Sequence, residues 1–173
     1  MLVDIDLDKY AKYSEIRNMV NEKSDFETEV VEYFQNLQNG ILGDKLPFYS
    51  AQQKIGFRRK EITVLAGVNG HGKSLILGQI ALDIVDKGSK ILMASLEMPP
   101  VSTLARMTKQ ATGVNIPTKQ QINEFMKWKL DQFYLFNHVG SLESWQVISL
   151  CRYAALELKV SHVIIDSLTK CTK

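Results

Sequence analysis

The chain has 173 residues, of which 45% are hydrophobic and 23% charged, a composition ordinary for a globular domain that excludes gross disorder. Its formal net charge is +2 with no basic run along the chain, so charge alone neither requires nor excludes a polyanionic partner. Two cysteines are too few for a disulfide framework. The sequence contains neither a signal-peptide pattern nor an apolar run of the ~20 residues that span a bilayer. We therefore expect a soluble, cytoplasmic protein.

The first part of the sequence predicts helices. A weak helical pattern covers Lys9–Val20, and a stronger amphipathic helix is predicted over Asp25–Gln38. Ser24 and Glu27 have the spacing of a capping box at its start, and Gly40 is expected to end it. The apolar face of this helix is made of Phe26, Val30, Val31, Phe34 and Leu37.

A loop is predicted next, because Asn39–Gln53 contains two glycines and Pro47. We therefore divide the chain into a helical linker or interface segment, residues 1–43, and a larger domain, residues 44–173. From Glu61 onward, apolar runs typical of strands alternate with helical patterns.

The alternation predicts an α/β fold with a mostly parallel sheet covered on both faces. The expected strands are Ile62–Ala66, Lys90–Ser95, Phe133–Phe136 and His162–Ile165. The expected helices are Lys73–Lys87, Pro99–Thr112 with its stop at Gly113, one capped by Thr118 and Gln121, and one over 143–158. In the last helix the residues predicted to face inward are Val147, Ile148, Cys151, Ala155 and Leu158.

The turn between the first strand and the first helix of this domain matches G-x-x-x-x-G-K-[ST], the phosphate-binding loop. Its residues are Gly67, Val68, Asn69, Gly70, His71, Gly72, Lys73 and Ser74. The glycines let successive backbone N–H groups face a phosphate, and the helix that follows adds the positive end of its dipole. Lys73 is expected to contact the β- and γ-phosphates of ATP, and Ser74 to bind Mg²⁺. His71 occupies a variable position and is assigned no chemistry.

Two carboxylates complete the predicted site. Asp166 follows three aliphatic residues at the end of a strand, where it would hold the water shell of Mg²⁺; a plain turn residue is the alternative. Glu97 follows the Lys90–Ser95 strand and is the best candidate for the base that orients the attacking water, against the alternative of a solvated loop carboxylate. The two strands predicted between the phosphate loop and Asp166 are typical of ATPases of the RecA, AAA+ and helicase kinds.

Three segments in order, Glu61–Ser74, Ser95–Met98 and His162–Leu168, resemble the replicative hexameric helicases of the DnaB type. Within that group they resemble phage primase–helicases and mitochondrial Twinkle helicases. Asn39–Phe48 also resembles the entry to that helicase domain, so the resemblance covers about residues 39–173. Lys60 departs from the family, which usually has glycine there.

The resemblance implies a RecA-like ATPase core in which Lys73 and Ser74 bind phosphate and Mg²⁺, Glu97 is the catalytic base and Asp166 is the second acid on the magnesium side. It implies a six-membered ring around single-stranded DNA, with ATP between neighbouring subunits and with primase or other replisome proteins as further partners. The helix Asp25–Gln38 would correspond to the linker helix that docks on the next subunit, although by its residues it could equally pack on its own domain.

A complete domain of this family would continue for roughly another hundred residues beyond Lys173, carrying a phosphate sensor, an arginine finger and DNA-binding loops. Arg106 and Arg152 are interpreted as surface or interface residues, and neither of them is interpreted as the arginine finger. The function expected from the resemblance is ATP-driven translocation on single-stranded DNA and duplex unwinding, in a bacterial or phage-infected cell. Two alternatives stay open: a nucleotide-binding partner or inhibitor of a helicase ring that does not hydrolyse ATP, and a RecA-like recombination ATPase.

Overall fold

The computed structural model describes residues 22–38, 43–52, 54–58 and 60–172. The chain divides into two units, Met1–Leu42 and Gly43–Lys173. The helical pattern predicted over Lys9–Val20 and the helix stop predicted at Gly40 lie outside the described residues. Within the described part of the chain, no helix combines the length and the apolar character that a membrane crossing needs.

The described part of the first unit is a 3₁₀ turn, η1 (Lys23–Phe26), that leads into α2 (Glu27–Gln38). The expected helix is therefore present, but its predicted capping box is not the one observed. The backbone N–H of Glu22 donates to the Asp25 carboxylate at 2.8 Å, so the first turn is capped two residues earlier than Ser24 and Glu27 would cap it. Val30, Val31 and Phe34 on the apolar face are each about half exposed within this unit.

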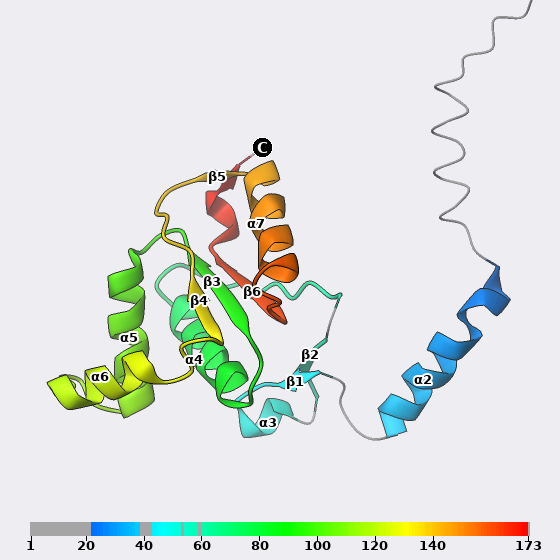
Figure 1. Ribbon diagram of the computed structural model, residues 1–173, viewed down its shortest axis with the longest axis horizontal. Helices are drawn as coiled ribbons and strands as arrows, with labels where there is room; N and C mark the ends of the chain where they lie inside the picture. The colour runs from blue at the N-terminus through cyan, green and yellow to red at the C-terminus, as the bar shows by residue number, and fades with distance from the viewer. Residues whose placement is uncertain (1–21, 39–42, 53, 59, 173) are drawn as a thin grey trace, which may run out of the picture. The chain divides into compact units, whose positions relative to one another are not determined.

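The second unit contains a parallel three-stranded sheet with the order β4–β3–β6 (Figure 1). The strands are β3 (Ile91–Ser95), β4 (Phe133–Leu135) and β6 (His162–Asp166). All five residues of β3 are buried, as a central strand covered on both faces requires. This confirms the predicted α/β class and the parallel pairing, and three of the four expected strands.

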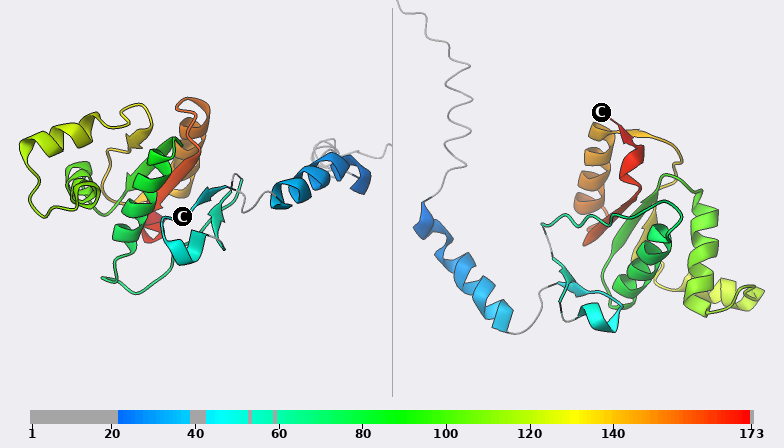
Figure 2. Two further views of the ribbon diagram at one scale, coloured as in Figure 1. Left: turned by 90° about the horizontal axis from the view of Figure 1, so that it is seen from below. Right: turned by 180° about the vertical axis from the view of Figure 1, so that it is seen from behind.

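Helices cover the sheet on both faces (Figures 1 and 2). On one face, α4 (Lys73–Asp86) packs Ile80 and Ile84 into a cluster with Ile91 and Met93. On the other face, α7 (Ser144–Leu156) places Val147 and Leu150 against a cluster that contains Ala94, Leu96 and Leu142. Next to α4 lies α5 (Pro100–Thr112), which in turn contacts α6 (Lys119–Lys127); Met107 and Phe125 of these two helices join the same cluster.

The observed helix ends match the predicted ones at the two ends that are defined by capping residues. Gly113 takes a left-handed conformation, φ 68°, directly after α5. Thr118 caps α6 reciprocally: its hydroxyl accepts from the Gln121 N–H at 3.3 Å, and its own N–H donates to the Gln121 side chain at 2.9 Å. Both features depend on residues only a few positions apart, which is why the sequence alone predicts them.

The strand predicted over Ile62–Ala66 does not form. Ile62 is 94% exposed and Val64 is 70% exposed, and no backbone hydrogen bond joins this segment to the described strands. An apolar run favours an extended backbone, but it becomes a strand only where it pairs with the edge of a sheet. The apolar pattern of the segment itself does not specify that edge.

Other segments also differ from the prediction. The expected loop 39–53 contains β1 (Asp44–Lys45), which pairs antiparallel with β2 (Gly56–Phe57), and α3 (Tyr49–Gln52). Two-residue strands β5 (Leu142–Glu143) and β7 (Cys171–Thr172) pair in parallel, with η2 (Leu168–Lys170) before β7. Strands of two residues are too short to show an alternating pattern of apolar and polar residues in the sequence.

The inward face of α7 is rotated from the predicted one. Ile148 is 54% exposed and Ala155 is exposed, whereas Ala154 is fully buried and Leu150 packs against the sheet-side cluster. The apolar residues of α7 surround most of the helix, so the pattern allowed several choices of buried face, and the contact with the sheet selected one.

Candidate functional site

The predicted phosphate-binding loop joins the extended segment before Gly67 to the first turn of α4. Gly70 and Gly72 have φ angles of 81° and 82°, in the left-handed region that side chains other than glycine rarely adopt. No heavy atom lies within 4 Å of where a Cβ would stand on either residue, so the space beside both glycines is open. Val68 (67% exposed) and His71 are also solvent-accessible.

Several backbone donors of this loop are unpaired. Among the described residues, no protein acceptor is found for the N–H groups of Gly70, Gly72, Lys73 and Ser74, while the His71 N–H donates to the Val68 carbonyl at 3.3 Å. The first N–H groups of any helix lack intrahelical partners, and here a glycine-rich turn precedes them. Unpaired backbone donors at a helix N-terminus suit an anion, above all a phosphate.

The Lys73 side chain folds back over the loop. Its ammonium donates to the Gly67 carbonyl at 2.8 Å and the Val68 carbonyl at 3.0 Å, with Asn69 Oδ1 at 3.4 Å. All three acceptors are neutral, and a phosphate oxygen would form a stronger, charge-assisted bond with the same ammonium. The Ser74 hydroxyl has no protein partner within the described chain and can serve as an oxygen ligand.

Asp166 closes β6 and is only 5% exposed. Its carboxylate makes no hydrogen bond or ion pair with any residue that the structure describes. A carboxylate at the end of a strand without a protein partner is available to a cation or to ordered water. This residue and Ser74 therefore fit the oxygen donors that a divalent cation such as Mg²⁺ prefers.

The sheet places Asp166 on the same side as α4. Ile91 and Met93 of β3 and Ile164 of β6 pack in the cluster that α4 forms, and side chains alternate along a strand, so Ser95 and Asp166 face that layer too. A short turn joins the end of α4 to the start of β3, so α4 begins toward the carboxyl ends of the strands (Figure 1). The phosphate loop and Asp166 thus belong to the same end and the same face of the sheet.

Glu97 lies at the same end of the sheet, two residues after β3. Its Oε1 accepts a hydrogen bond from the Ser167 hydroxyl at 2.6 Å, and that hydroxyl lies 2.6 Å from Thr169 Oγ1. The Leu96 N–H donates to the Asp166 carbonyl at 2.6 Å, so the chain segments that leave β3 and β6 are held together. Glu97 is exposed to solvent, as a residue that must reach a water molecule needs to be.

Sequence reasoning missed Ser95, Ser167 and Thr169. Ser95 is 3% exposed and pairs in register with Asp166, which could have been inferred only by aligning the two strands at their carboxyl ends. Ser167 directly follows Asp166, but its bond to Glu97 is a tertiary contact without a local signal. Arg106, interpreted as a surface or interface residue, is half-buried and donates to Met98 Sδ at 3.0 Å, next to Glu97 in the chain.

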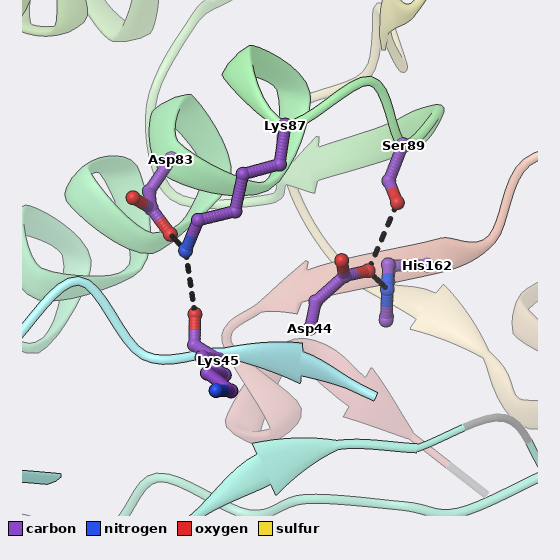
Figure 3. A network of polar contacts seen from close by, with 6 residues as sticks. All are labelled: Asp44, Lys45, Asp83, Lys87, Ser89 and His162. Atoms are coloured by element: carbon purple, nitrogen blue, oxygen red, sulfur yellow. Dashed lines mark hydrogen bonds and ion pairs between the residues drawn. The ribbon is translucent and has the colours of Figure 1, made fainter. Parts of the chain in front are cut away.

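A second polar cluster lies at the opposite end of the sheet (Figure 3). Asp44 Oδ2 is 2.6 Å from His162 Nε2 and accepts the Ser89 hydroxyl at 2.9 Å. Lys87 donates to the Lys45 carbonyl at 3.1 Å and pairs with a carboxylate of its own helix. The histidine and the serine both contact the same carboxylate oxygen and not each other, so the serine is not paired with the imidazole as a nucleophile would be. The cluster links β1 to the sheet.

A cavity of about 580 Å³ lies between α4, α5 and α6, away from the phosphate loop. Three carboxylates, those of Asp83, Asp86 and Glu124, are among its lining residues, which suits no phosphate. The open turn at residues 67–74 is therefore a better candidate phosphate site than this cavity. No protein-family model matches the chain.

Proposed function

We propose that this chain binds ATP with Mg²⁺ at the 67–74 loop and hydrolyses it as the ATPase domain of a ring-forming replicative DNA helicase. The observation that carries the ATP part is the loop itself. The N–H groups at the start of α4 and the folded-back Lys73 ammonium lie at the same end of the sheet as the Asp166 carboxylate, and neither these N–H groups nor that carboxylate has a partner among the described residues.

Each residue has a role that follows from its chemistry. Lys73 exchanges the neutral carbonyls of Gly67 and Val68 for phosphate oxygens, and the loop N–H groups hold the β-phosphate. The Ser74 hydroxyl and the Asp166 carboxylate would hold Mg²⁺, the latter through water. When bound, the cation supplies positive charge against the phosphate oxygens.

Glu97 accepts the proton of the attacking water. It is exposed and lies just beyond the central strand, and the hydrogen bond from Ser167 restricts where its carboxylate can be. A carboxylate held in this way orients a water molecule for in-line attack, which is the task of the base in ATP-hydrolysing enzymes.

The helicase part rests on the resemblance of the three motif segments. In that reading the chain assembles into a six-membered ring on single-stranded DNA, in contact with primase or other replisome proteins. The half-exposed apolar side chains of α2 support the interpretation of that helix as a docking element for a neighbouring copy, since a single helix cannot bury its own apolar face.

The test is equilibrium binding of a fluorescent ATP analogue with Mg²⁺, followed by phosphate release with and without single-stranded DNA. We expect Lys73→Ala to abolish binding, because it removes the mobile cation of the loop, and Lys127→Ala, an exposed lysine on α6, to leave it unchanged. Binding without hydrolysis would favour the non-hydrolysing partner of a helicase ring. Hydrolysis without stimulation by DNA would count against the helicase, and no binding at all would overturn the ATP site.

A further inference from the structure

Ser95 is the last residue of the central strand, and its hydroxyl is buried without a partner. The residue is 3% exposed, and its Oγ makes no hydrogen bond to any group that the structure describes. Buried polar atoms in native proteins nearly always have a partner, so an unpaired hydroxyl marks a place where something outside the chain completes the bonding.

The other buried hydroxyls of the described chain show why Ser95 differs. Thr103 and Thr108 are as deeply buried, but each sits in α5 and donates to the carbonyl four residues earlier, at 3.3 and 2.7 Å. A helix offers such a carbonyl to every hydroxyl on it. A strand has no carbonyl one helical turn back along the chain, and the described structure offers the Ser95 hydroxyl no other acceptor.

The neighbour of Ser95 in the sheet is Asp166. The two residues pair in register on adjacent parallel strands, on the face covered by α4. Neither side chain bonds to the other or to a third residue in the described structure. Neighbouring strands lie about 4.8 Å apart, so one water can bridge two side chains that stand next to each other without a direct hydrogen bond.

We infer that Ser95 is a positioning residue of the proposed Mg²⁺ site, where its hydroxyl and the Asp166 carboxylate hold one water of the cation's shell. Mg²⁺ gives up its water reluctantly and is bound in proteins through one or two carboxylates and several retained waters. The Asp166 carboxylate would accept one hydrogen of such a water and the Ser95 oxygen the other, which leaves the Ser95 O–H available to an acceptor on the bound nucleotide. The inference rests on the proposed function, because it adds a residue to the same site.

The test compares Ser95→Ala with Thr108→Val in thermal unfolding, with a non-hydrolysable ATP analogue and increasing Mg²⁺. Without nucleotide, Ser95→Ala should melt at the wild-type temperature or above it, because it removes an unpaired buried hydroxyl. With the analogue, the Mg²⁺ concentration for half-maximal stabilisation should rise about tenfold or more, as when other outer-shell partners of a metal are removed. Thr108→Val should melt lower, because it breaks a satisfied hydrogen bond, and keep the wild-type Mg²⁺ dependence.

A wild-type Mg²⁺ dependence in Ser95→Ala would overturn the inference and leave the proposed ATP site intact. If the wild-type protein shows no stabilisation by the analogue with Mg²⁺, both the proposed function and the inference fail. Should Ser95→Ala not fold, Ser95→Cys replaces it: the side chain keeps nearly the same volume, but sulfur is a weak hydrogen-bond partner. The same rise in the required Mg²⁺ concentration is then expected.

Discussion

The Ser167 hydroxyl donates to Glu97 Oε1 at 2.6 Å, across 70 positions of the sequence. This bond joins the segment that leaves β3 to the segment that leaves β6, directly beside Asp166. The two carboxylates that sequence reasoning assigned to separate strand ends therefore belong to one group of residues. The contact also gives the exposed Glu97 a defined place, on which its proposed role as a base depends.

Glu97→Gln should retain ATP affinity and lose turnover by about 10²-fold or more, because the amide cannot accept the proton of the attacking water. The measurement is a nucleotide titration beside steady-state phosphate release. Glu157→Gln, an exposed glutamate just beyond α7, is the matched control and should behave as wild type. Parallel loss of affinity and turnover in Glu97→Gln would remove Glu97 from the role of base.

Ser167→Ala should reduce kcat several-fold while the nucleotide affinity stays the same, because the variant frees the Glu97 carboxylate without altering the phosphate loop. Ser167→Thr restores a hydroxyl and should recover most of the lost rate. Single-turnover phosphate release separates this effect from a change in product release. An unchanged kcat in Ser167→Ala would mean that the hydrogen bond does not position Glu97.

Asp44→Asn and His162→Gln should each lower the free energy of unfolding by ~1–3 kcal/mol, the usual loss for a partly buried hydrogen bond to a charged group. The double variant should lose less than the two single losses added together, because both remove the same 2.6 Å contact. Urea unfolding monitored by tryptophan fluorescence measures all four proteins. Additive losses would show that the two side chains do not interact in solution.

Ile62→Ala should change the free energy of unfolding by less than ~0.5 kcal/mol, because its side chain is 94% exposed. Ile84→Ala, the comparison variant, removes a side chain that is 2% exposed and should lower stability by ~2–5 kcal/mol. Denaturant unfolding gives both values. A large loss in Ile62→Ala would mean that Ile62–Ala66 is a buried strand in solution, as its apolar pattern predicts.

Burial raises the pKa of the Cys151 thiol, and the neighbouring charge of Cys171 raises that pKa further. Alkylation by iodoacetamide near pH 8 should therefore be slower for Cys151 in the native protein than in the unfolded chain, since only the thiolate reacts. The folded-state pKa lies above the unfolded one, so this thiol contributes stability that is lost as pH rises through the folded value. The Cys171→Ser variant allows Cys151 to be measured alone; equal native and unfolded rates would contradict the prediction.

The amino-acid sequence by itself determined the features that depend on neighbours in the chain. The capping of α6 by Thr118 and Gln121, the stop of α5 at Gly113, and the buried character of Ile91–Ser95 all follow from residues a few positions apart. The glycine-rich turn before α4 is of the same kind, since its backbone angles require glycine at Gly70 and Gly72.

Only the tertiary structure decided which segments meet. It left Ile62–Ala66 unpaired, set Ser95 beside Asp166, and joined Glu97 to Ser167. Periodicity predicts that a segment can form a strand or helix but not which edge or face accepts it, because that choice depends on the packing of residues far apart in the chain. The chemical groups of the candidate site could thus be chosen from the sequence, while their arrangement required the fold.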